Sequence, residues 1–545
     1  MASSSKASSS SSSVDTVDES KVHKYSDVYD VKMPTEKHIY ELLEKAFKKC
    51  PKKELLVDGH TDEVRTAEQL ETQITQLTNT LNKRGLKKGD IVTICMESNL
   101  QYLVILMAVL RNGATYHGHL PMLNTKESKE ELEDVGPRIV FYSEQTATVV
   151  KEAFKNLSSV EMSFQIPQQF QELLDEGSAI QDAPPRIGGD LDPALLVYTS
   201  GTTGKPKGVL LSHRSLICSI AGTASAYSFP DDSVFLLWST LAFCDELLVM
   251  LMSLCHCHKT ILMHSKQLDF DLVKNVVGPV MKYKVTALPC VVTVVVRILG
   301  NPNFKTFDLS SIRILLVGGS LIPPKLMEGI KAALPHAFVI QAYGQTEVGT
   351  ITHATPLNSS KIASCGKLLP FFESKVVAES GNLAAPGEPG VIKIRGPQVM
   401  LGYHRSPEAT AKKIDTEGWL DSGDVGYYDK EGFYYIVERN DDIIKCMAVK
   451  VAPWELEAVL RTHPGVLDVT VVGKKDQEYG EVPVAFVVRN PEFSQLSEEE
   501  LTEYINKQVS EMNQLRGGVI FIDIVPRSRR GKPKRAELRK KYLNA

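Results

Sequence analysis

The sequence has no excess of charge of either sign and no long run of apolar residues. Its 62 basic and 66 acidic residues leave a formal net charge of −4 and a pI near 6.4, so no overall field would attract nucleic acid or an anionic membrane. The most apolar windows, 103–110 and 285–300, are short or are broken by charged residues and proline, whereas a membrane-spanning helix needs about 18 or more apolar residues. We therefore expect neither a nucleic-acid partner nor a transmembrane segment.

Targeting signals and a disulfide pattern are also absent from the sequence. The nine cysteines are odd in number and spread over the whole chain, unlike a disulfide framework, and this favours a reducing compartment. The serine-rich segment 1–20 has no apolar stretch for a signal peptide and carries acids where a transit peptide carries arginines, so we expect a disordered tail. The chain ends in Leu543-Asn544-Ala545, which is not the peroxisomal Ser-Lys-Leu signal. A cytoplasmic location is the remaining expectation.

Helical patterns alternate with short strand patterns along the chain, which is typical of an α/β protein. Strands are predicted at 91–96, 138–142, 195–198 and 312–317. At 545 residues the chain is too long for one hydrophobic core, and the charged stretch 440–442 is typical of a linker. We predict a large N-terminal α/β domain of layered sheets and helices at 21–439 and a smaller, mobile C-terminal α+β domain at 440–545.

Residues 198–208, directly after a predicted strand, form the most informative segment. From Thr199 to Gly208 this segment has four hydroxyl residues and three glycines, a composition that leaves backbone N–H groups open to a phosphate chain. Pro206 stands where the P-loop pattern needs its second glycine, so P-loop chemistry is not implied. A flexible surface turn would have a similar composition. We predict a phosphate-binding loop.

This segment closely resembles the signature of the adenylate-forming superfamily, which includes acyl-CoA synthetases, 4-coumarate CoA ligases, beetle luciferases and the adenylation domains of peptide synthetases. The resemblance covers nearly all of the chain after the tail and returns, in the expected order, at 317–320, 341–347, 419–424 and 526–532. It implies an enzyme that uses ATP and Mg²⁺ to convert a carboxylic acid into an acyl-adenylate and pyrophosphate. The acyl group would then pass to the thiol of coenzyme A.

The resemblance also assigns roles to single residues. Tyr343 would lie against adenine, Asp424 would hold both ribose hydroxyls and Arg439 would make a second ribose contact. Thr346 would lie near the α-phosphate, and Glu347 would bind Mg²⁺, a cation that takes carboxylate oxygens alongside phosphates. The full set assigned to nucleotide or cofactor binding is Thr199, Ser200, Gly201, Thr202, Thr203, Gly204, Lys207, Gly319, Ala342, Tyr343, Asp424, Arg439 and Lys445.

Lys532 is the principal candidate for catalysis, with Thr346 and Glu347 beside it. In the family this late lysine, on a mobile loop of the small domain, neutralises the repulsion between the acid's carboxylate and the α-phosphate. The resemblance assigns Gly318 and Ser320 to the wall of the purine and acyl pocket. A plain turn between a strand and a helix would account for these two residues equally well.

The sequence departs from the family at two places. Many relatives carry a histidine before the apolar helix at 247–254, where this chain has Phe243; an aromatic ring there could still gate the pocket, but light emission is less expected. The neighbouring Asp245 and Glu246 could suit an amine-bearing acid, although acids are common in the first turn of a helix. Ala448 replaces a usual glycine beside the expected pantetheine passage, so its methyl group could narrow that passage.

Several interpretations therefore stay open. The principal one is an AMP-forming synthetase of fatty or aryl acyl-CoA, and the sequence does not name the acid or the oligomeric state. The alternatives are a luciferase-like enzyme, an enzyme that transfers the acyl group to an amine or a carrier protein, and a catalytically idle binding protein. The stretch 255–258 alternates cysteine with histidine, but on a strand its four side chains would point to two faces and could not surround one zinc ion.

Overall fold

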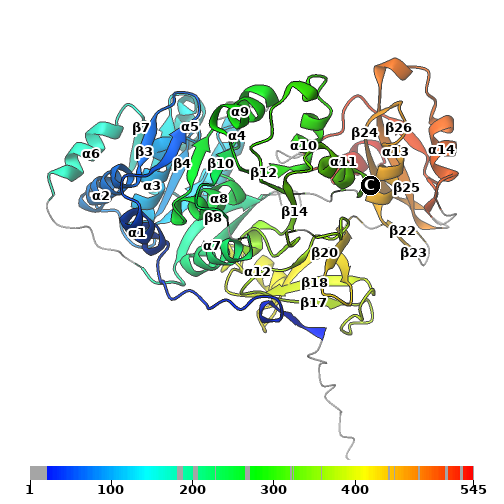
Figure 1. The fold of residues 1–545 in the computed structure, drawn as a ribbon, viewed down its shortest axis with the longest axis horizontal. Helices are drawn as coiled ribbons and strands as arrows, with labels where there is room; N and C mark the ends of the chain where they lie inside the picture. The colour runs from blue at the N-terminus through cyan, green and yellow to red at the C-terminus, as the bar shows by residue number, and fades with distance from the viewer. Residues whose placement is uncertain are drawn as a thin grey trace, which may run out of the picture.

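The computed structural model describes residues 21–543, except 181–187, 200–205, 228, 264–270, 320–321, 323, 358, 440–441, 443, 447–448, 477–478, 510–512 and 528–531. These residues form a large N-terminal α/β domain with three sheets and a small C-terminal domain with its own sheet (Figure 1). The predicted fold class is confirmed. Among the described residues, no helix is long and apolar enough to cross a membrane.

The first sheet has seven strands, and its parallel part runs through β8, β5, β4, β6 and β7. Two further strands, β9 and β19, continue the sheet in antiparallel pairing beyond β8. In sheet order the strands are β19 (Gly402–Tyr403), β9 (Lys207–Ser212), β8 (Pro193–Thr199), β5 (Thr115–Gly118), β4 (Ile91–Cys95), β6 (Ile139–Ser143) and β7 (Met162–Ile166).

The second sheet has nine strands, of which the six from β14 to β2 in sheet order are parallel. Parallel strands that are covered on both faces need nearly continuous apolar sequences. This requirement explains the apolar residues of the strand predicted at 312–317. In sheet order the strands are β16 (Lys367–Leu368), β15 (His353–Ala354), β14 (Phe338–Tyr343), β13 (Ile314–Gly318), β12 (Ala287–Val291), β10 (Val234–Leu237), β11 (Lys259–Leu262), β2 (Glu54–Asp58) and β3 (Val64–Thr66).

Helix α3 (Leu100–Arg111) lies in the core that these two sheets share and is buried along nearly its whole length. The helix starts at Asn99, whose side chain accepts a hydrogen bond from the backbone N–H of Tyr102 at 3.1 Å. A helix that is apolar all round is stable only inside a core. The other helices of the large domain are α1 (Ile39–Lys49), α2 (Ala67–Lys83), α4 (Thr125–Val135), α5 (Ala147–Phe154), α6 (Phe170–Ser178), α7 (His213–Tyr227), α8 (Cys244–Cys255), α9 (Gly278–Tyr283), α10 (Val292–Leu299), α11 (Pro324–Ala333) and α12 (Pro407–Lys413).

The third sheet of the large domain is antiparallel and lies below the other two in the view of Figure 1. Its strand β18 alternates buried with half-buried residues, the pattern of a sheet with one face toward the core. In sheet order the strands are β1 (His23–Lys24), β17 (Glu373–Val377), β18 (Gly390–Arg395), β20 (Leu420–Tyr428) and β21 (Tyr434–Arg439).

The small domain has its own apolar cores around Val471 and Val484, as expected for a separate folding unit. Its described residues form a five-stranded sheet with α-helices. The strands are β22 (Ile444–Cys446), β23 (Val449–Val451), β24 (Val466–Asp476), β25 (Gly480–Arg489) and β26 (Val519–Phe521), and the helices are α13 (Pro453–Leu460), α14 (Glu498–Asn506) and α15 (Arg535–Tyr542).

The stretch 255–258 is not a strand. Cys255 is the last residue of α8, Cys257 has a left-handed φ of 58° in the following turn, and β11 begins only at Lys259. The alternation argument against zinc therefore does not apply to this stretch. The Cys257 thiol donates to the carbonyl oxygen of Ala46 at 3.4 Å, so this turn packs against α1.

Candidate active site

Strands β8 and β9 form a hairpin whose loop contains most of the predicted phosphate-binding residues. Thr199 ends β8 and pairs with Lys207, the first residue of β9. The loop therefore leaves the sheet at the carboxyl end of β8, the edge where open α/β sheets bind ligands. The predicted residues Ser200, Gly201, Thr202, Thr203 and Gly204 lie outside the described residues.

Tyr198 fastens the end of β8 to α4. Its hydroxyl donates a hydrogen bond to the carboxylate of Asp134. Burial, and then the hydrogen bond and negative charge of Asp134, raise the pKa of Tyr198, so the phenol stays protonated at neutral pH. The start of the loop is thus held by a hydrogen bond that does not titrate in the physiological range.

Glu347 and Lys207 both lie next to the side chain of Tyr403. The hydroxyl of Tyr403 donates to Glu347 Oε1 at 3.0 Å, and Lys207 Nζ lies 5.2 Å from the centre of the same ring. The backbone holds this arrangement, because Met400 N–H donates to the carbonyl oxygen of Glu347 at 2.9 Å. A carboxylate and an ammonium group are thereby placed beside the loop, where a phosphate chain and its metal ion would need them. Sequence reasoning missed Tyr403, because it belongs to no motif and comes close to β9 only through the pairing of β19 with β9.

Tyr343 and Asp424 also meet, although 81 positions separate them. The Tyr343 hydroxyl donates to Asp424 Oδ2 at 2.7 Å, and Asp424 is only 5% exposed. Gln345 Nε2 donates to the carbonyl oxygen of Ser422 at 3.2 Å and so makes a second link between the two segments. Strand β20 thereby brings the predicted ribose contact to the carboxyl end of β14, next to the residue assigned to adenine. Arg439 is paired with Asp424 on the neighbouring strand β21.

Glycines allow the strand ends to approach each other closely. Gly319 has a left-handed φ of 84° directly after β13, a conformation that glycine adopts without strain. A Cβ on Gly318 would lie 3.2 Å from the carbonyl oxygen of Ala342, and a Cβ on Gly344 would lie 1.7 Å from that of Thr350. The turn that carries Thr346 and Glu347, the short helix η5 (Thr346–Val348), therefore depends on Gly344. Ser320, predicted in the pocket wall, lies outside the described residues.

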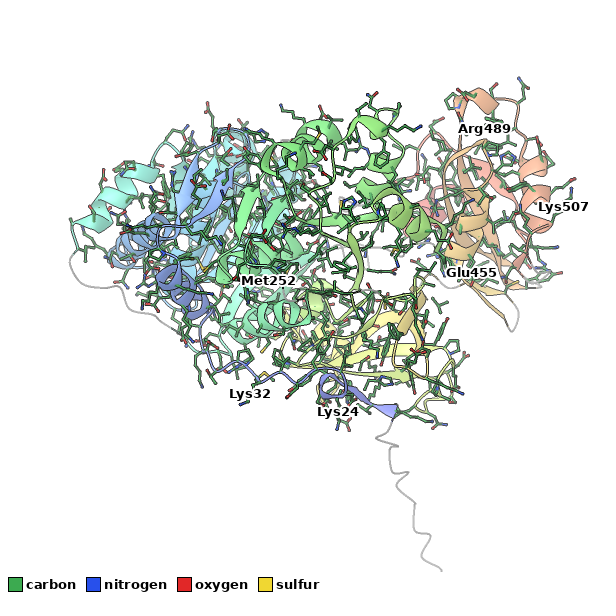
Figure 2. The ribbon with its side chains drawn as sticks, in the orientation of Figure 1. Lys24, Lys32, Met252, Glu455, Arg489 and Lys507 are labelled. Carbon is green, nitrogen blue, oxygen red and sulfur yellow. The ribbon has the colours of Figure 1, made fainter. Side chains whose placement is uncertain are left out.

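An apolar cavity of about 30 Å³ lies next to these strand ends. It is bounded by α7, α8, β10, β12 and β13 and by the turn after η5. Leu316 of β13 precedes Gly318 by two positions, and Ile351 follows Glu347 by four, so the cavity is lined by the strand that carries Gly318 and by the turn that follows Glu347. Figure 2 labels Met252 of α8, which also lines the cavity. Apart from the apolar character of α8, no sequence pattern indicated this cavity.

Phe243 and Glu246 mark the start of α8. Phe243, predicted to line the pocket, is the half-buried N-cap residue, with its backbone N–H on the carbonyl oxygen of Thr240 at 3.1 Å. Asp245 is exposed, as a first-turn acid usually is, but Glu246 is only 7% exposed and its Oε2 has no hydrogen-bond partner among the described residues. Burial, and then the charge of Asp245, raise the pKa of Glu246 well above its usual value. The first-turn interpretation therefore fits Asp245 and not Glu246.

Lys532 and Lys445 belong to the small domain. Lys532 is exposed and precedes Pro533, which forms a bridge with Arg527 ahead of α15. Lys445 pairs with Lys450 between β22 and β23. The small domain lies beside α11 (Figure 1). Tyr504 in α14 shows this proximity, because its pKa is lowered by hydrogen bonds with Thr462 and Gln508 and also by the charge of Lys325 in α11. The roles of Lys532 and Lys445 remain predictions from the resemblance.

The two-domain α/β fold, the carboxylates of Asp424 on β20 and Glu347 on η5, and the adjoining apolar cavity fit a nucleotide-dependent enzyme. The chain belongs to the AMP-binding enzyme family, whose sequence pattern matches residues 43–404. The pattern of the AMP-binding enzyme C-terminal domain matches residues 455–532. The chain is thus a member of the adenylate-forming superfamily, and the resemblance is confirmed.

Known proteins with similar sequences are CoA ligases. The chain is 34% identical to 4-coumarate-CoA ligase 3 of Oryza sativa subsp. japonica over 500 residues, which cover 89% of this chain and 88% of the relative. It is 32% identical to 4-coumarate-CoA ligase 1 of Narcissus pseudonarcissus over 497 residues, with coverage of 89% and 90%.

Solved structures with the same fold come from the same superfamily. The o-succinylbenzoate CoA synthetase (MenE) of Bacillus subtilis, in complex with its acyl-adenylate intermediate, superposes with a TM-score of 0.78 at 26% identity, covering 91% of this chain and 97% of that one. A Mycobacterium tuberculosis fatty acyl CoA synthetase gives a TM-score of 0.72 at 26% identity, with coverage of 93% and 98%. The chain is an ATP-dependent ligase by family, and its acid is a separate question.

Proposed function

We propose that the chain is an AMP-forming acid–thiol ligase that makes an acyl-adenylate from a fatty or aryl acid and then passes the acyl group to coenzyme A. The observation that carries this proposal is the pair of carboxylates held by tyrosine hydroxyls, Asp424 by Tyr343 and Glu347 by Tyr403. Tyr403 lies in β19, which pairs with β9 directly after the loop, and Tyr343 is the last residue of β14. Their spacing along the chain is large, so only the fold brings them together.

The nucleotide would be held by groups of matching chemistry. The two oxygens of the Asp424 carboxylate can accept hydrogen bonds from both ribose hydroxyls, and the Tyr343 ring offers a face to the base. Lys207 supplies positive charge for the phosphate chain, and Glu347 supplies the oxygen ligand that Mg²⁺ prefers. When bound, Mg²⁺ would offset the negative charge that develops on the pyrophosphate leaving group.

In the first half-reaction, a carboxylate oxygen of the acid would attack the α-phosphorus of ATP, and the bond from this phosphorus to the pyrophosphate oxygen would break. Lys532 would neutralise the two negative groups as they approach. In the second half-reaction, the sulfur of coenzyme A would attack the acyl carbon, and AMP would leave with the electron pair of the broken bond. In the proposed cycle, the small domain would present different residues to each step.

The acid would occupy the apolar cavity. Its space of about 30 Å³ holds about two water molecules, so an acyl chain or aromatic ring requires the flexible Met252 and its neighbours to move. Met side chains adapt to such changes at little cost. The 4-coumarate CoA ligases among the relatives support an aryl acid, and the fatty acyl CoA synthetase among the structures supports a fatty acid.

Coenzyme A is proposed as the acceptor because the relatives named above are CoA ligases. Ala448, the departure that could narrow the thiol passage, lies outside the described residues. The rival acceptors are an amine or a carrier protein, and a luciferase-like reaction with oxygen is the rival chemistry. A binding protein without activity is the rival of another class.

The test is a screen of short, medium, long and aromatic acids for pyrophosphate release, each with and without coenzyme A. With the preferred acid and coenzyme A, the proposal predicts equal amounts of AMP, pyrophosphate and thioester; without coenzyme A, it predicts pyrophosphate and the acyl-adenylate but no thioester. Adenylate without thioester for every active acid would favour the amine or carrier-protein rival. Light emission with oxygen would favour the luciferase-like rival, and no release with any acid would favour the binding protein.

A further inference from the structure

A second group of chemically active side chains lies apart from the candidate active site, at the carboxyl end of β5. His117 and His119 are two positions apart on an extended segment, so their side chains point to the same side. Helix α4 brings Glu131 to the two imidazoles. The histidine side chains are 0% exposed and that of Glu131 is 9% exposed. Neither the resemblance nor the proposed reaction gives these three residues a role.

The three side chains converge on one point. His119 Nδ1 lies 2.6 Å from Glu131 Oε1, and His117 Nε2 lies 3.3 Å from the same oxygen. One ligand atom from each residue lies within 4.8 Å of the other two. His117 Nε2 has no hydrogen-bond partner among the described residues, and burying a polar atom without a partner destabilises the folded state. This nitrogen therefore points toward Glu131 but makes no hydrogen bond, in the described part of the chain, that would offset its burial.

The other nitrogen of each imidazole is held by a hydroxyl. His117 Nδ1 lies 2.9 Å from Thr93 Oγ1, and His119 Nε2 lies 3.0 Å from Ser128 Oγ. Histidines that bind a metal through one nitrogen are usually oriented by a hydrogen bond at the other. Both rings are therefore fixed in the manner of metal ligands, with their remaining nitrogens on one carboxylate.

We propose that His117, His119 and Glu131 bind one Zn²⁺ ion. Two imidazole nitrogens and a carboxylate oxygen are donors that zinc takes, at bond lengths of about 2.0–2.2 Å, and these lengths place tetrahedral ligands about 3.3 Å apart. The 3.3 Å from His117 to Glu131 matches this spacing, and the 2.6 Å from His119 to Glu131 has to open by a fraction of an ångström. A water molecule or the Cys95 thiol, which adjoins His119, would complete the coordination.

The ion would join β5 to α4 beside the strand that leads into the phosphate-binding loop. The His117 ring packs edge-on against the ring of Tyr198, with 5.5 Å between centres, and Tyr198 is bonded to Asp134, one turn beyond Glu131 in α4. Zinc would therefore stiffen the support of the loop without touching the substrates. We assign it a structural role, expressed in stability more than in turnover.

The first test is the metal content of the full-length chain, expressed with added zinc and purified without chelators or a metal-affinity tag. About one zinc per chain is expected, with X-ray absorption showing only nitrogen and oxygen or one sulfur at about 2.0–2.3 Å. This measurement uses the unaltered protein, so it does not depend on the folding of any variant. Wild-type protein that holds no zinc, even after incubation with excess zinc, would overturn the proposal and leave a proton between His119 and Glu131.

The second test compares Glu131→Gln and His117→Gln with the matched control Glu130→Gln. Glu130 lies next to Glu131 on α4, is exposed and contacts Lys126 at 4.0 Å. Zinc affinity should fall at least about tenfold in the first two variants and stay unchanged in the control. Zinc should also raise the Tm of the wild type and the control only. Equal zinc binding by all four proteins would show surface-bound metal and would overturn the proposal.

Discussion

Two tyrosine hydroxyls orient the carboxylates of the candidate site. Tyr343 donates to Asp424 at 2.7 Å, and Tyr403 donates to Glu347 at 3.0 Å. A carboxylate that is already oriented loses less conformational freedom when it binds a ribose or a metal ion. Each carboxylate is therefore oriented by a tyrosine that lies far from it in the sequence.

Asp424→Asn should raise the KM for ATP by about ten- to a hundredfold, because a charge-assisted hydrogen bond contributes about 1.5–3 kcal/mol. The ribose is bound in the ground state as well as in the transition state, so kcat should change less than KM. Steady-state kinetics of pyrophosphate release at varied ATP measure both values.

The matched control for this variant is Asp421→Asn on the same strand, where the carboxylate accepts from the backbone N–H of Gly423 at 2.8 Å. Its KM should stay near the wild-type value. A fall in kcat with an unchanged KM for Asp424→Asn would contradict the ribose assignment.

Glu246→Gln should raise the Tm at pH 7. Burial, and then the charge of Asp245, raise the pKa of Glu246 above its usual 4.5, so the wild type loses stability as the pH rises from below 4.5 toward the folded-state pKa. Glutamine carries no charge at any pH and avoids this loss. Thermal unfolding from pH 4 to pH 8 should show a gain for the variant that shrinks toward pH 4, where both states of the wild type are protonated.

Glu328→Gln in α11 is the control for Glu246→Gln, because it makes the same substitution at an exposed helical position. Its Tm should follow that of the wild type at every pH. A pH-independent gain for Glu246→Gln would show that packing, and not ionisation, limits stability at this position.

At the scale of elements, the ends of β13 and β14 and the middle of β20 meet at one place, and η5, which follows β14, contacts β9. The turn from β14 into η5 is the tightest of these connections, because Gly344 lies against the backbone of Thr350. This turn positions Tyr343 before it and Glu347 after it. A change in its path would therefore displace both contacts of the candidate site.

Gly344→Ala should lower both the Tm and the rate of pyrophosphate release, since its Cβ would lie 1.7 Å from the carbonyl oxygen of Thr350. Gly329→Ala in α11 is the matched control, because nothing lies within 4 Å of its Cβ. Because alanine favours a helix more than glycine does, the free energy of unfolding of this control should rise by about 0.5–1 kcal/mol. Normal activity and stability of Gly344→Ala would show that the turn can shift without harm to the site.

The strands and the loop position could be predicted from sequence, because apolar runs that end in glycine-rich turns leave a local pattern. The strand predicted at 195–198 lies within β8, Pro193–Thr199, and the strand predicted at 91–96 covers β4, Ile91–Cys95. Tyr403 could not be found in this way, since its contact with Glu347 depends on the pairing of β19 with β9. The proposed metal ligands His117, His119 and Glu131 were missed for the same reason, because only the folded chain brings Glu131 of α4 next to the two histidines at the end of β5.

At the scale of the whole molecule, the small domain is attached through a short segment that its last helix holds. Arg535 of α15 contacts Asp442 at 3.1 Å and Glu457 at 2.7 Å, and Arg539 lies 3.6 Å from Asp442. Asp442 therefore moves with the small domain, and any rotation between the domains must occur before this residue. The charged stretch 440–442 predicted as a linker is consistent with this position.

Lys532→Ala provides the most direct test of the account, because Lys532 is proposed to act only while the acid approaches the α-phosphate. The variant should release pyrophosphate about a hundred- to a thousandfold more slowly than the wild type, and Lys534→Ala, in the same exposed segment, should not. Both variants should form thioester from a synthetic acyl-adenylate and coenzyme A at the wild-type rate. Equal losses in the two half-reactions for Lys532→Ala, or no loss in either, would contradict the assignment of Lys532 to adenylation.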